Sequence, residues 1–117
     1  MSLNKNCLII PVYNNEKSLG ILIENIKEIN DRLSNKLEVL FIVDGSLDNC
    51  YEILKKNLSN QKFSSKIILL SRNFGALNAI RTGLEIADGN YFATMSADLQ
   101  EPTDLVINFF KTLHNEP

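Results

Sequence analysis

The 117-residue sequence has no run of about 18–20 consecutive apolar residues, the length that a membrane-spanning helix needs. Its first residues, MSLNKN, lack the apolar core of a secretory signal. Twelve basic and 14 acidic residues give a net charge of −2, and no long basic stretch stands out. Bulk attraction to nucleic acid is therefore not expected. If the protein binds phosphates, it must use a few placed groups or a metal ion.

Cysteine and histidine are scarce. The two cysteines, Cys7 and Cys50, do not have the spacing of metal ligands, so two buried or half-buried free thiols are the simplest interpretation. Free thiols are typical of a reducing compartment. The only histidine, His114, falls late in the last predicted helix and is better explained as a surface residue near a helix end than as a catalyst. Catalysis by a nucleophile–histidine pair therefore has no support.

Three ligand motifs are also missing. The sequence contains no G-x-G-x-x-G, no G-x-x-x-x-G-K-[ST] and no serine or cysteine in a nucleophile elbow. These absences argue against a dinucleotide fingerprint, a P-loop and a hydrolase of that type.

Strand-like and helix-like segments alternate four times. Apolar runs rich in branched residues predict buried strands at 7–12, 37–43, 66–71 and 91–95. Apolar residues at helical spacing predict helices at 19–33, 48–58, 76–87 and 102–113, with Asp48 as a cap of the second and Gly89 as a stop after the third. With short connections, this order predicts one α/β domain with a mainly parallel sheet in three layers, α/β/α.

Polar residues collect directly after each predicted strand. The four groups are Pro11, Tyr13, Asn14 and Asn15; Asp44, Gly45, Ser46 and Asp48; Ser71, Arg72, Asn73 and Gly75; and Ser96, Asp98 and Gln100. One polar loop alone needs no explanation beyond helix capping and turns. Ligands of open parallel sheets bind beyond the carboxyl ends of the strands, so four such groups together favour a binding site there.

The segment MSADLQEP suggests the kind of ligand. Asp98 and Gln100 offer oxygen atoms at alternate positions after a strand. A hard divalent cation usually binds through one or two carboxylates together with substrate phosphates. An acidic site in a near-neutral protein can hold a diphosphate only if a metal reverses the local charge. These residues therefore predict a cation site that works with a diphosphate.

Five segments resemble, in order and spacing, the nucleotide-sugar half of family 2 glycosyltransferases. They are IIPVYNN (9–15), VDGSLDN (43–49), SRNFG (71–75), GLEIADGNY (83–91) and ADLQEP (97–102). SRNFG and DLQEP are most similar to the polyprenyl-phosphate glycosyltransferases, of the dolichol-phosphate mannose synthase and bactoprenol glucosyltransferase type. The resemblance implies the nucleotide-binding half of a GT-A (Rossmann-like) fold. It also implies inverting transfer of a sugar from a nucleoside diphosphate to a polyprenyl phosphate.

The resemblance further implies roles for individual residues. Pro11 and Tyr13 would lie against the base, Asp44 would accept from the base N–H, and Arg72 would lie near the nucleotide. The implied nucleotide-binding set is Pro11, Tyr13, Asn14, Asp44, Ser46, Arg72 and Asp98. Asp98 and Gln100, with Ser96 as a further candidate, would hold Mg²⁺ or Mn²⁺ against the diphosphate. A uridine diphosphate sugar is the first expectation for the donor.

Two residues depart from the family pattern. Val43 stands where the first Asp of Asp-Asp-Gly-Ser is usual, and Ser96 where the first Asp of Asp-x-Asp is usual. Each change removes a charge. The alternative to an active transferase is therefore a catalytically inactive nucleotide- or protein-binding module of the same fold. A receiver-like domain is less well supported, because no acidic pair follows the first strand.

The resemblance also implies segments outside the 117 residues. In the family, an acceptor half follows and supplies the general base, so the general base is expected beyond residue 117 and the catalytic residues stay unassigned. Residues 1–117 would then be the donor half of a longer enzyme, inactive alone, with a lipid-phosphate acceptor bound through the missing segments. We expect a cytoplasmic location, at the cytoplasmic face of the membrane for the full-length protein.

Overall fold

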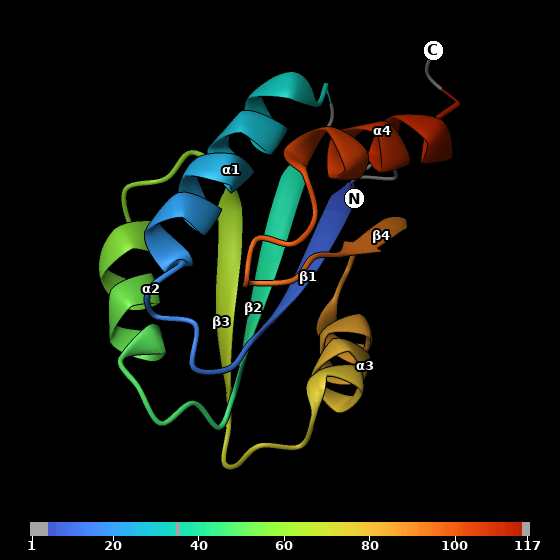
Figure 1. The fold of residues 1–117 in the computed structure, drawn as a ribbon. Coiled ribbons are helices and arrows are strands. Elements are labelled where there is room, and N and C mark those ends of the chain that lie inside the picture. Colours follow the sequence, from blue (N-terminus) through green and yellow to red (C-terminus); the bar gives the residue numbers. More distant parts are fainter. Residues whose placement is uncertain (1–4, 35, 116–117) are drawn as a thin grey trace.

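A computed structural model describes residues 5–34 and 36–115 of the chain, in which parallel strands alternate with helices (Figure 1). The elements are β1 (Asn6–Val12), α1 (Leu19–Arg32), β2 (Leu37–Asp44), α2 (Cys50–Leu58), β3 (Ser64–Leu70), α3 (Ala76–Ile86), β4 (Tyr91–Thr94) and α4 (Thr103–Leu113). The strand order is β3-β2-β1-β4, and each neighbouring pair is parallel. The α/β fold is confirmed, and each of the eight elements lies within two residues of its expected bounds.

The two central strands form the middle of the core. Each residue of β2 is buried, as are six of the seven in β1, which explains why both read as nearly continuous apolar runs. Their register pairs Asn6 with Leu37 and Val12 with Val43. The two strands therefore end side by side, and the loops that follow them start as neighbours.

Helices cover both faces of the sheet, as predicted, but unequally. Helices α1, α2 and α4 pack on one face, where alternate strand residues such as Leu8, Ile10 and Phe41 join the larger core cluster. Helix α3 covers the other face (Figure 1). There Ile9 and Ile42 form a smaller core cluster with Ala79 of α3. The small-residue face of α3 has a direct cause, because a Cβ on Gly83 would lie 2.6 Å from Cγ2 of Ile9.

Two expected helix boundaries are wrong. Helix α3 ends at Ile86 with extended Ala87 as its cap, and Gly89 instead lies against the start of β1. A Cβ on Gly89 would be 2.7 Å from both Cys7 Sγ and the Lys5 carbonyl oxygen, so close packing explains this glycine. Helix α2 begins at Cys50 after Asn49, one residue later than an Asp48 cap would give.

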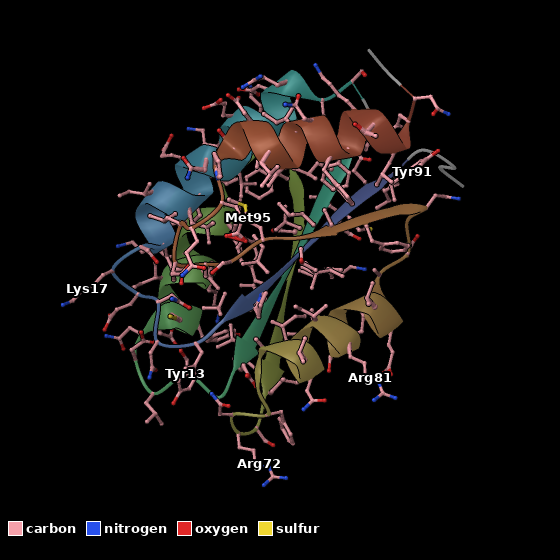
Figure 2. All side chains as sticks on the ribbon, turned by 45° about the vertical axis from the view of Figure 1, so that its right-hand side comes forward. Tyr13, Lys17, Arg72, Arg81, Tyr91 and Met95 are labelled. Carbon is pink, nitrogen blue, oxygen red and sulfur yellow. The ribbon has the colours of Figure 1, made fainter. Side chains whose placement is uncertain are left out.

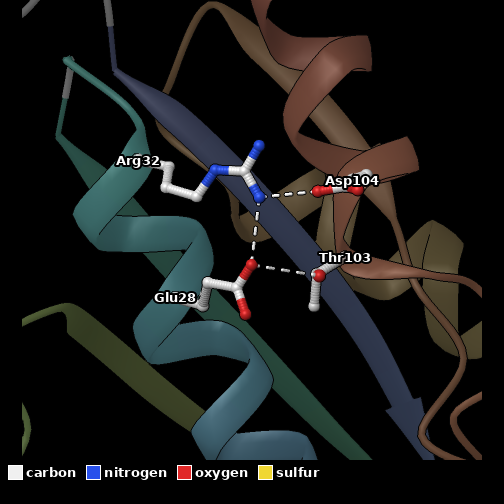
Figure 3. Close-up of polar contacts among 4 residues, drawn as sticks. All are labelled: Glu28, Arg32, Thr103 and Asp104. Atoms are coloured by element: carbon white, nitrogen blue, oxygen red, sulfur yellow. Dashed lines mark hydrogen bonds and ion pairs between the residues drawn. The ribbon is translucent and has the colours of Figure 1, made fainter.

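Side chains from α1 hold the beginning of α4 (Figure 3). The Arg32 guanidinium lies 2.6 Å from the Asp104 carboxylate and 3.0 Å from that of Glu28, which also accepts from the Thr103 hydroxyl at 3.5 Å. These groups are solvent-exposed, so each pair is worth little to stability. They connect α1 to the first turn of α4, which follows the MSADLQEP turn.

The histidine lies far from the polar loops, and both cysteines are buried. His114 is half-buried rather than on the surface: its Nε2 lies 2.7 Å from Asn6 Oδ1, and its ring centroid is 3.9 Å from that of Tyr91. Asn6 and Tyr91 begin β1 and β4, so His114 lies at the opposite end of the sheet from the loops that follow the strands. Cys7 and Cys50 are free and buried, as expected. Across 5–34 and 36–115, the helices are all too short or too polar to cross a membrane.

Candidate functional site

Loops one (13–18) and two (45–49) are joined by reciprocal hydrogen bonds. The Asn14 amide donates to Ser46 Oγ at 2.7 Å, and the Leu47 amide donates to Asn14 Oδ1 at 2.9 Å. Asn14 has a φ of 53°, a left-handed conformation in which asparagine is enriched. Asn14 and Ser46 therefore shape the junction of the two loops.

Asp48 reinforces the same junction. Its Oδ2 accepts from the Glu16 amide at 3.1 Å, and its Oδ1 accepts from the Ser46 hydroxyl at 2.9 Å and from the Cys50 amide at 3.2 Å. Burial acts to raise the pKa of Asp48, but the hydrogen bonds from Cys50, Glu16 and Ser46 outweigh it and hold the pKa below its ordinary value. The ionised carboxylate is thus part of the scaffold.

Cys50 lies directly beneath this junction. Its Sγ accepts from the Asn15 amide at 3.2 Å. Burial, together with the hydrogen bond to the nearby Asp48 carboxylate, raises the pKa of the thiol to about 11. A thiol with this pKa stays protonated at neutral pH and is a poor nucleophile, so Cys50 is structural.

Loop three (71–75) is attached to the end of β2. Asp44 is 2% exposed, and its Oδ1 and Oδ2 accept from the amides of Phe74 at 2.8 Å and Gly75 at 3.0 Å. The Arg72 guanidinium lies 4.7 Å from the centroid of the exposed Phe74 ring. Asp44 thus attaches loop three to the end of β2, and loop three presents the Arg72 and Phe74 side chains to solvent.

Loop four (95–102) is held from two sides. The Ser18 hydroxyl donates to the Ala97 carbonyl at 2.6 Å, and the Ser96 amide donates to Glu101 Oε1 at 2.8 Å. Within the loop, the Ser96 hydroxyl donates to the Asp98 carboxylate. The turn that carries Asp98 is therefore fixed by loop one and by its own glutamate.

A hollow of about 500 Å³ opens between loops one, two and four. It is lined by Asn14, Asn15, Glu16, Lys17, Ser18, Asp48 and Asp98. Of the predicted site residues, Asn14 and Asp98 face this hollow. Pro11, Tyr13, Asp44, Ser46, Arg72, Ser96 and Gln100 do not line it. Figure 2 shows Tyr13, Lys17 and Arg72 at the loop end of the molecule, and Tyr91 at the other end.

Glu16, Lys17 and Ser18 line the hollow although no sequence motif singled them out. Lys17 brings a positive charge to the hollow that also contains Asp98, and Ser18 fixes loop four. Because they lie between the first strand and the first helix, the sequence could have indicated them as candidate site residues. Their contacts with loop four depend on chain packing that no local pattern reveals.

The Ser96 hydroxyl contacts the Asp98 carboxylate. Across the described ranges 5–34 and 36–115, no three His, Cys, Asp or Glu side chains are grouped to hold a metal ion. Asp98 and Gln100 are exposed, and Ser96 offers a hydroxyl. One carboxylate with neutral oxygens fits a magnesium or manganese ion that takes the rest of its ligands from substrate phosphates, and it does not fit a closed protein cage.

Residues 7–117 match the sequence pattern of Glycosyl transferase family 2. The chain belongs to this family. It is 37% identical over 105 residues to the uncharacterized glycosyltransferase YkcC of Bacillus subtilis (strain 168), covering 89% of this chain and 32% of that protein. It is 36% identical over 102 residues to the undecaprenyl-phosphate 4-deoxy-4-formamido-L-arabinose transferase of Proteus mirabilis (strain HI4320), covering 87% and 31%. The chain thus spans about a third of these relatives, which include the polyprenyl-phosphate branch indicated by SRNFG and DLQEP.

Solved structures of glycosyltransferases have the same fold. Staphylococcus aureus TarS 1-349 in complex with UDP-GlcNAc gives a TM-score of 0.76 at 22% identity, covering 95% of this chain and 31% of that one. The mannosyltransferase PcManGT from Pyrobaculum calidifontis, in complex with GDP-Man and Mn²⁺, gives 0.73 at 20% identity, covering 88% and 30%. The fold of the family 2 chain is accordingly of the GT-A type.

Proposed function

We propose that residues 1–117 are the donor half of an inverting glycosyltransferase that binds a nucleoside diphosphate sugar with a divalent metal. The observation that carries this proposal is the hollow at the carboxyl ends of the strands, where Asp98 faces loops one and two. Hydrogen bonds between loops one, two and four hold this arrangement in place. A site organised in advance does not have to order its loops when it binds.

The nucleotide would lie along the loops at the carboxyl edge of the sheet. Tyr13 is exposed and, with Pro11, offers a surface for the base, while Arg72 and the Asn14–Ser46 junction would lie near the ribose and phosphates. The Lys17 ammonium at the hollow offers a charge that complements a phosphate. The structures of TarS with UDP-GlcNAc and of PcManGT with GDP-Man support a nucleotide-sugar ligand, and a uridine diphosphate sugar remains our first choice.

Asp98 would hold the cation, with Gln100 and Ser96 as further oxygen donors. When bound, Mg²⁺ or Mn²⁺ would stabilise negative charge on the leaving nucleoside diphosphate. The complex of PcManGT with GDP-Man and Mn²⁺ supports a divalent metal for this fold. The chain's own contribution is to hold Asp98 on a fixed turn, through Ser18 and Glu101.

The acceptor would be a polyprenyl phosphate, at the cytoplasmic face of the membrane. The name of the Proteus mirabilis relative, an undecaprenyl-phosphate transferase, supports this class of acceptor. We assign no general base among residues 5–34 and 36–115 and place it in an acceptor half outside them. The chain spans about a third of its relatives' length, which leaves room for such a half.

The surface beside β4 supports an acceptor half. Among the described residues 5–34 and 36–115, β4 pairs with β1 alone and forms one edge of the sheet. Next to it lies an apolar hollow of about 450 Å³, where Leu84, Leu105 and Phe109 are about half exposed. An apolar surface next to an open strand edge is suited to covering by further polypeptide. We assign this surface to the acceptor half of the same enzyme.

A second candidate is a catalytically inactive nucleotide- or protein-binding module. Ser96 favours it, because its hydroxyl donates to Asp98 and supplies no second charge to a cation. Val43 favours it as well, because its side chain is buried in the core and offers nothing to a ligand.

Calorimetric titration of the 117-residue chain with UDP, GDP and ADP in Mn²⁺ tests the proposal. We expect binding that depends on Mn²⁺ and differs between the three nucleotides. Negligible heats for all three would remove the nucleotide site. The two candidates are then separated with a full-length protein: sugar transfer to a polyprenyl phosphate indicates an enzyme, and nucleotide binding without transfer indicates the inactive module.

A further inference from the structure

Glu101 uses only one of its two carboxylate oxygens within the part of the chain that the structure describes. Oε1 accepts from the Ser96 amide at 2.8 Å, whereas Oε2 is buried there without a hydrogen-bond partner. Two other buried side-chain atoms, on Asn6 and Glu38, also lack a hydrogen-bond partner among the described residues, but they lie where β1 and β2 begin, at the opposite end of the sheet. A buried carboxylate oxygen without a donor costs free energy, so Glu101 is suited to a hydrogen bond from outside.

The Glu101 side chain lies at the apolar hollow of about 450 Å³ beside β4. The other lining residues that the structure describes are apolar except for Thr94, and they include Leu84, Leu105 and Phe109. Glu101 is thus the charged residue of this lining. A polypeptide that fills the hollow would bury apolar side chains and would also meet the Glu101 carboxylate.

The backbone of β4 offers hydrogen-bonding groups at the same place. The amides of Tyr91 and Met95 donate to carbonyl groups of β1 at 3.4 and 3.1 Å. Because successive residues of a strand point in alternate directions, the amides of Phe92 and Thr94 are turned toward the open edge. Both residues line the hollow. A strand laid along this edge would therefore pair with β4 and cover Glu101.

Glu101 is also connected to the candidate cation site. The Ser96 amide donates to Glu101, and the Ser96 hydroxyl donates to the Asp98 carboxylate. Asp98 lines the hollow between the loops, and Glu101 lines the hollow beside β4. One short turn thus carries one carboxylate to each hollow.

We propose that Glu101 is the docking contact for the acceptor half: a segment outside residues 1–117 lies along β4, fills the apolar hollow and donates an N–H hydrogen bond to Glu101 Oε2. The chain spans about a third of the length of its curated relatives, which leaves chain for such a segment. This inference rests on the proposed function and deepens it, because it names the residue through which the acceptor half meets the Asp98 turn.

Glu101→Gln tests the contact and leaves the turn its own hydrogen bond. The glutamine carbonyl can still accept from the Ser96 amide, but an NH₂ group replaces Oε2 and cannot accept. Amide hydrogen exchange is measured for the full-length protein and for residues 1–117, each with and without the substitution. In the full-length protein, the Phe92 and Thr94 amides should be protected, and Glu101→Gln should speed up their exchange by at least about tenfold. In residues 1–117 both amides should exchange rapidly, and the substitution should not speed them up.

Glu24→Gln is the matched control, because Glu24 is an exposed glutamate on α1 that pairs with Lys27 at 3.5 Å. It should leave the Phe92 and Thr94 amides unchanged in both proteins. Protected amides in β1 show that each variant is folded. No change on Glu101→Gln in the full-length protein, or an equal change in both proteins, would overturn the proposal, because Glu101 would then act only within its turn.

Two further outcomes are decisive. If full-length Glu101→Gln does not fold, the wild-type proteins are compared: protection of the Phe92 and Thr94 amides in the full-length protein alone supports the proposal, and equal exchange in both overturns it. If residues 1–117 protect these amides more as their concentration rises, a second copy of the chain covers the hollow, and its assignment to the acceptor half is wrong.

These measurements need neither nucleotide nor sugar. If the full-length protein binds no nucleotide and transfers no sugar, the proposed function fails, while exchange in β4 still decides whether a segment is docked at Glu101. If it transfers sugar but exchanges its Phe92 and Thr94 amides rapidly, the proposed function stands and the docking contact is wrong.

Discussion

The Ser18 hydroxyl, at the start of α1, donates to the Ala97 carbonyl 2.6 Å away, although the two residues are 79 positions apart in the chain. Ala97 immediately precedes Asp98. The first loop of the sheet therefore determines where the carboxylate of the fourth loop lies. The candidate metal ligand depends on a residue that belongs to none of the segments resembling the family.

Ser18→Ala should reduce both stability and ligand binding. The change removes the hydrogen bond to the carbonyl of the buried Ala97 and the longer one to the Asn15 carbonyl. We expect a loss of about 1 kcal/mol in the free energy of unfolding. Affinity for nucleotide in Mn²⁺ should fall as well, because the Asp98 turn is less restrained. Denaturant unfolding and calorimetry measure the two effects. Ser59→Ala, whose exposed hydroxyl makes a similar bond to the Lys56 carbonyl, is the control and should alter only stability, slightly. Equal affinities for Ser18→Ala and wild type would contradict this role.

Gly45→Ala should be severely destabilising. The residue has a positive φ, which costs about 1–3 kcal/mol for a residue with a Cβ, and the added Cβ would collide with backbone atoms of Arg72 and Asn73. Gly20→Ala is a matched control on α1, where a Cβ meets nothing within 4 Å. It should stabilise the protein by up to about 1 kcal/mol through helix propensity. Thermal unfolding measures the stability of both variants. A Gly45→Ala variant as stable as wild type would contradict the close approach of loops two and three.

Asp48 should make stability depend on pH in the acid range. Burial acts to raise its pKa, but hydrogen bonds from Cys50, Glu16 and Ser46 outweigh burial. The folded pKa therefore lies below the unfolded value of about 3.9. The stabilisation is present above the unfolded pKa and is lost as the pH falls through the lower, folded pKa. NMR titration of the carboxyl carbon measures this pKa, and Asp48→Asn should flatten the acid limb of the stability curve. A midpoint at or above the ordinary aspartate value would contradict the hydrogen-bonded junction.

The two cysteines should resist alkylation in the native protein. Burial raises the pKa of both thiols, that of Cys50 to about 11, so little thiolate exists at pH 8. Iodoacetamide labelling followed by mass spectrometry should show little modification of the folded chain and full modification in denaturant. Rapid native labelling of Cys50 would mean that loops one and two open freely.

The sequence was sufficient to predict the strands and helices and the edge of the sheet at which polar residues gather. Alternating apolar runs and helical spacing predict an α/β fold because each pattern reports burial directly. The order of the elements then places each loop at one end. Asp98 and Asn14 could be found in this way, since each lies in the loop that follows a strand.

Other features depend on contacts between distant segments, which periodicity does not encode. The sequence predicted Gly89 as a helix stop, but a glycine is needed there because Cys7 and Lys5 leave no room for a side chain. Asp44 was expected to accept from a base, and the sequence did not reveal that its oxygens also accept from the amides of Phe74 and Gly75. In both cases, the residue type indicated a special position, but the sequence did not reveal which distant residues it contacts.

The most direct measurement of the central claim is Mn²⁺ titration, with UDP present, of wild type, Asp98→Ala and Ser96→Asp. The proposal places a divalent cation at Asp98 beside the diphosphate, where Ser96 supplies no charge. Asp98→Ala should then abolish Mn²⁺-dependent binding. Ser96→Asp should tighten it, because a second anionic oxygen raises affinity for a hard cation. In chelator, Ser96→Asp should be less stable, since two neighbouring carboxylates repel. If Ser96→Asp binds Mn²⁺ no better and Asp98→Ala no worse than wild type, this turn is not a metal site and the proposed donor site is wrong.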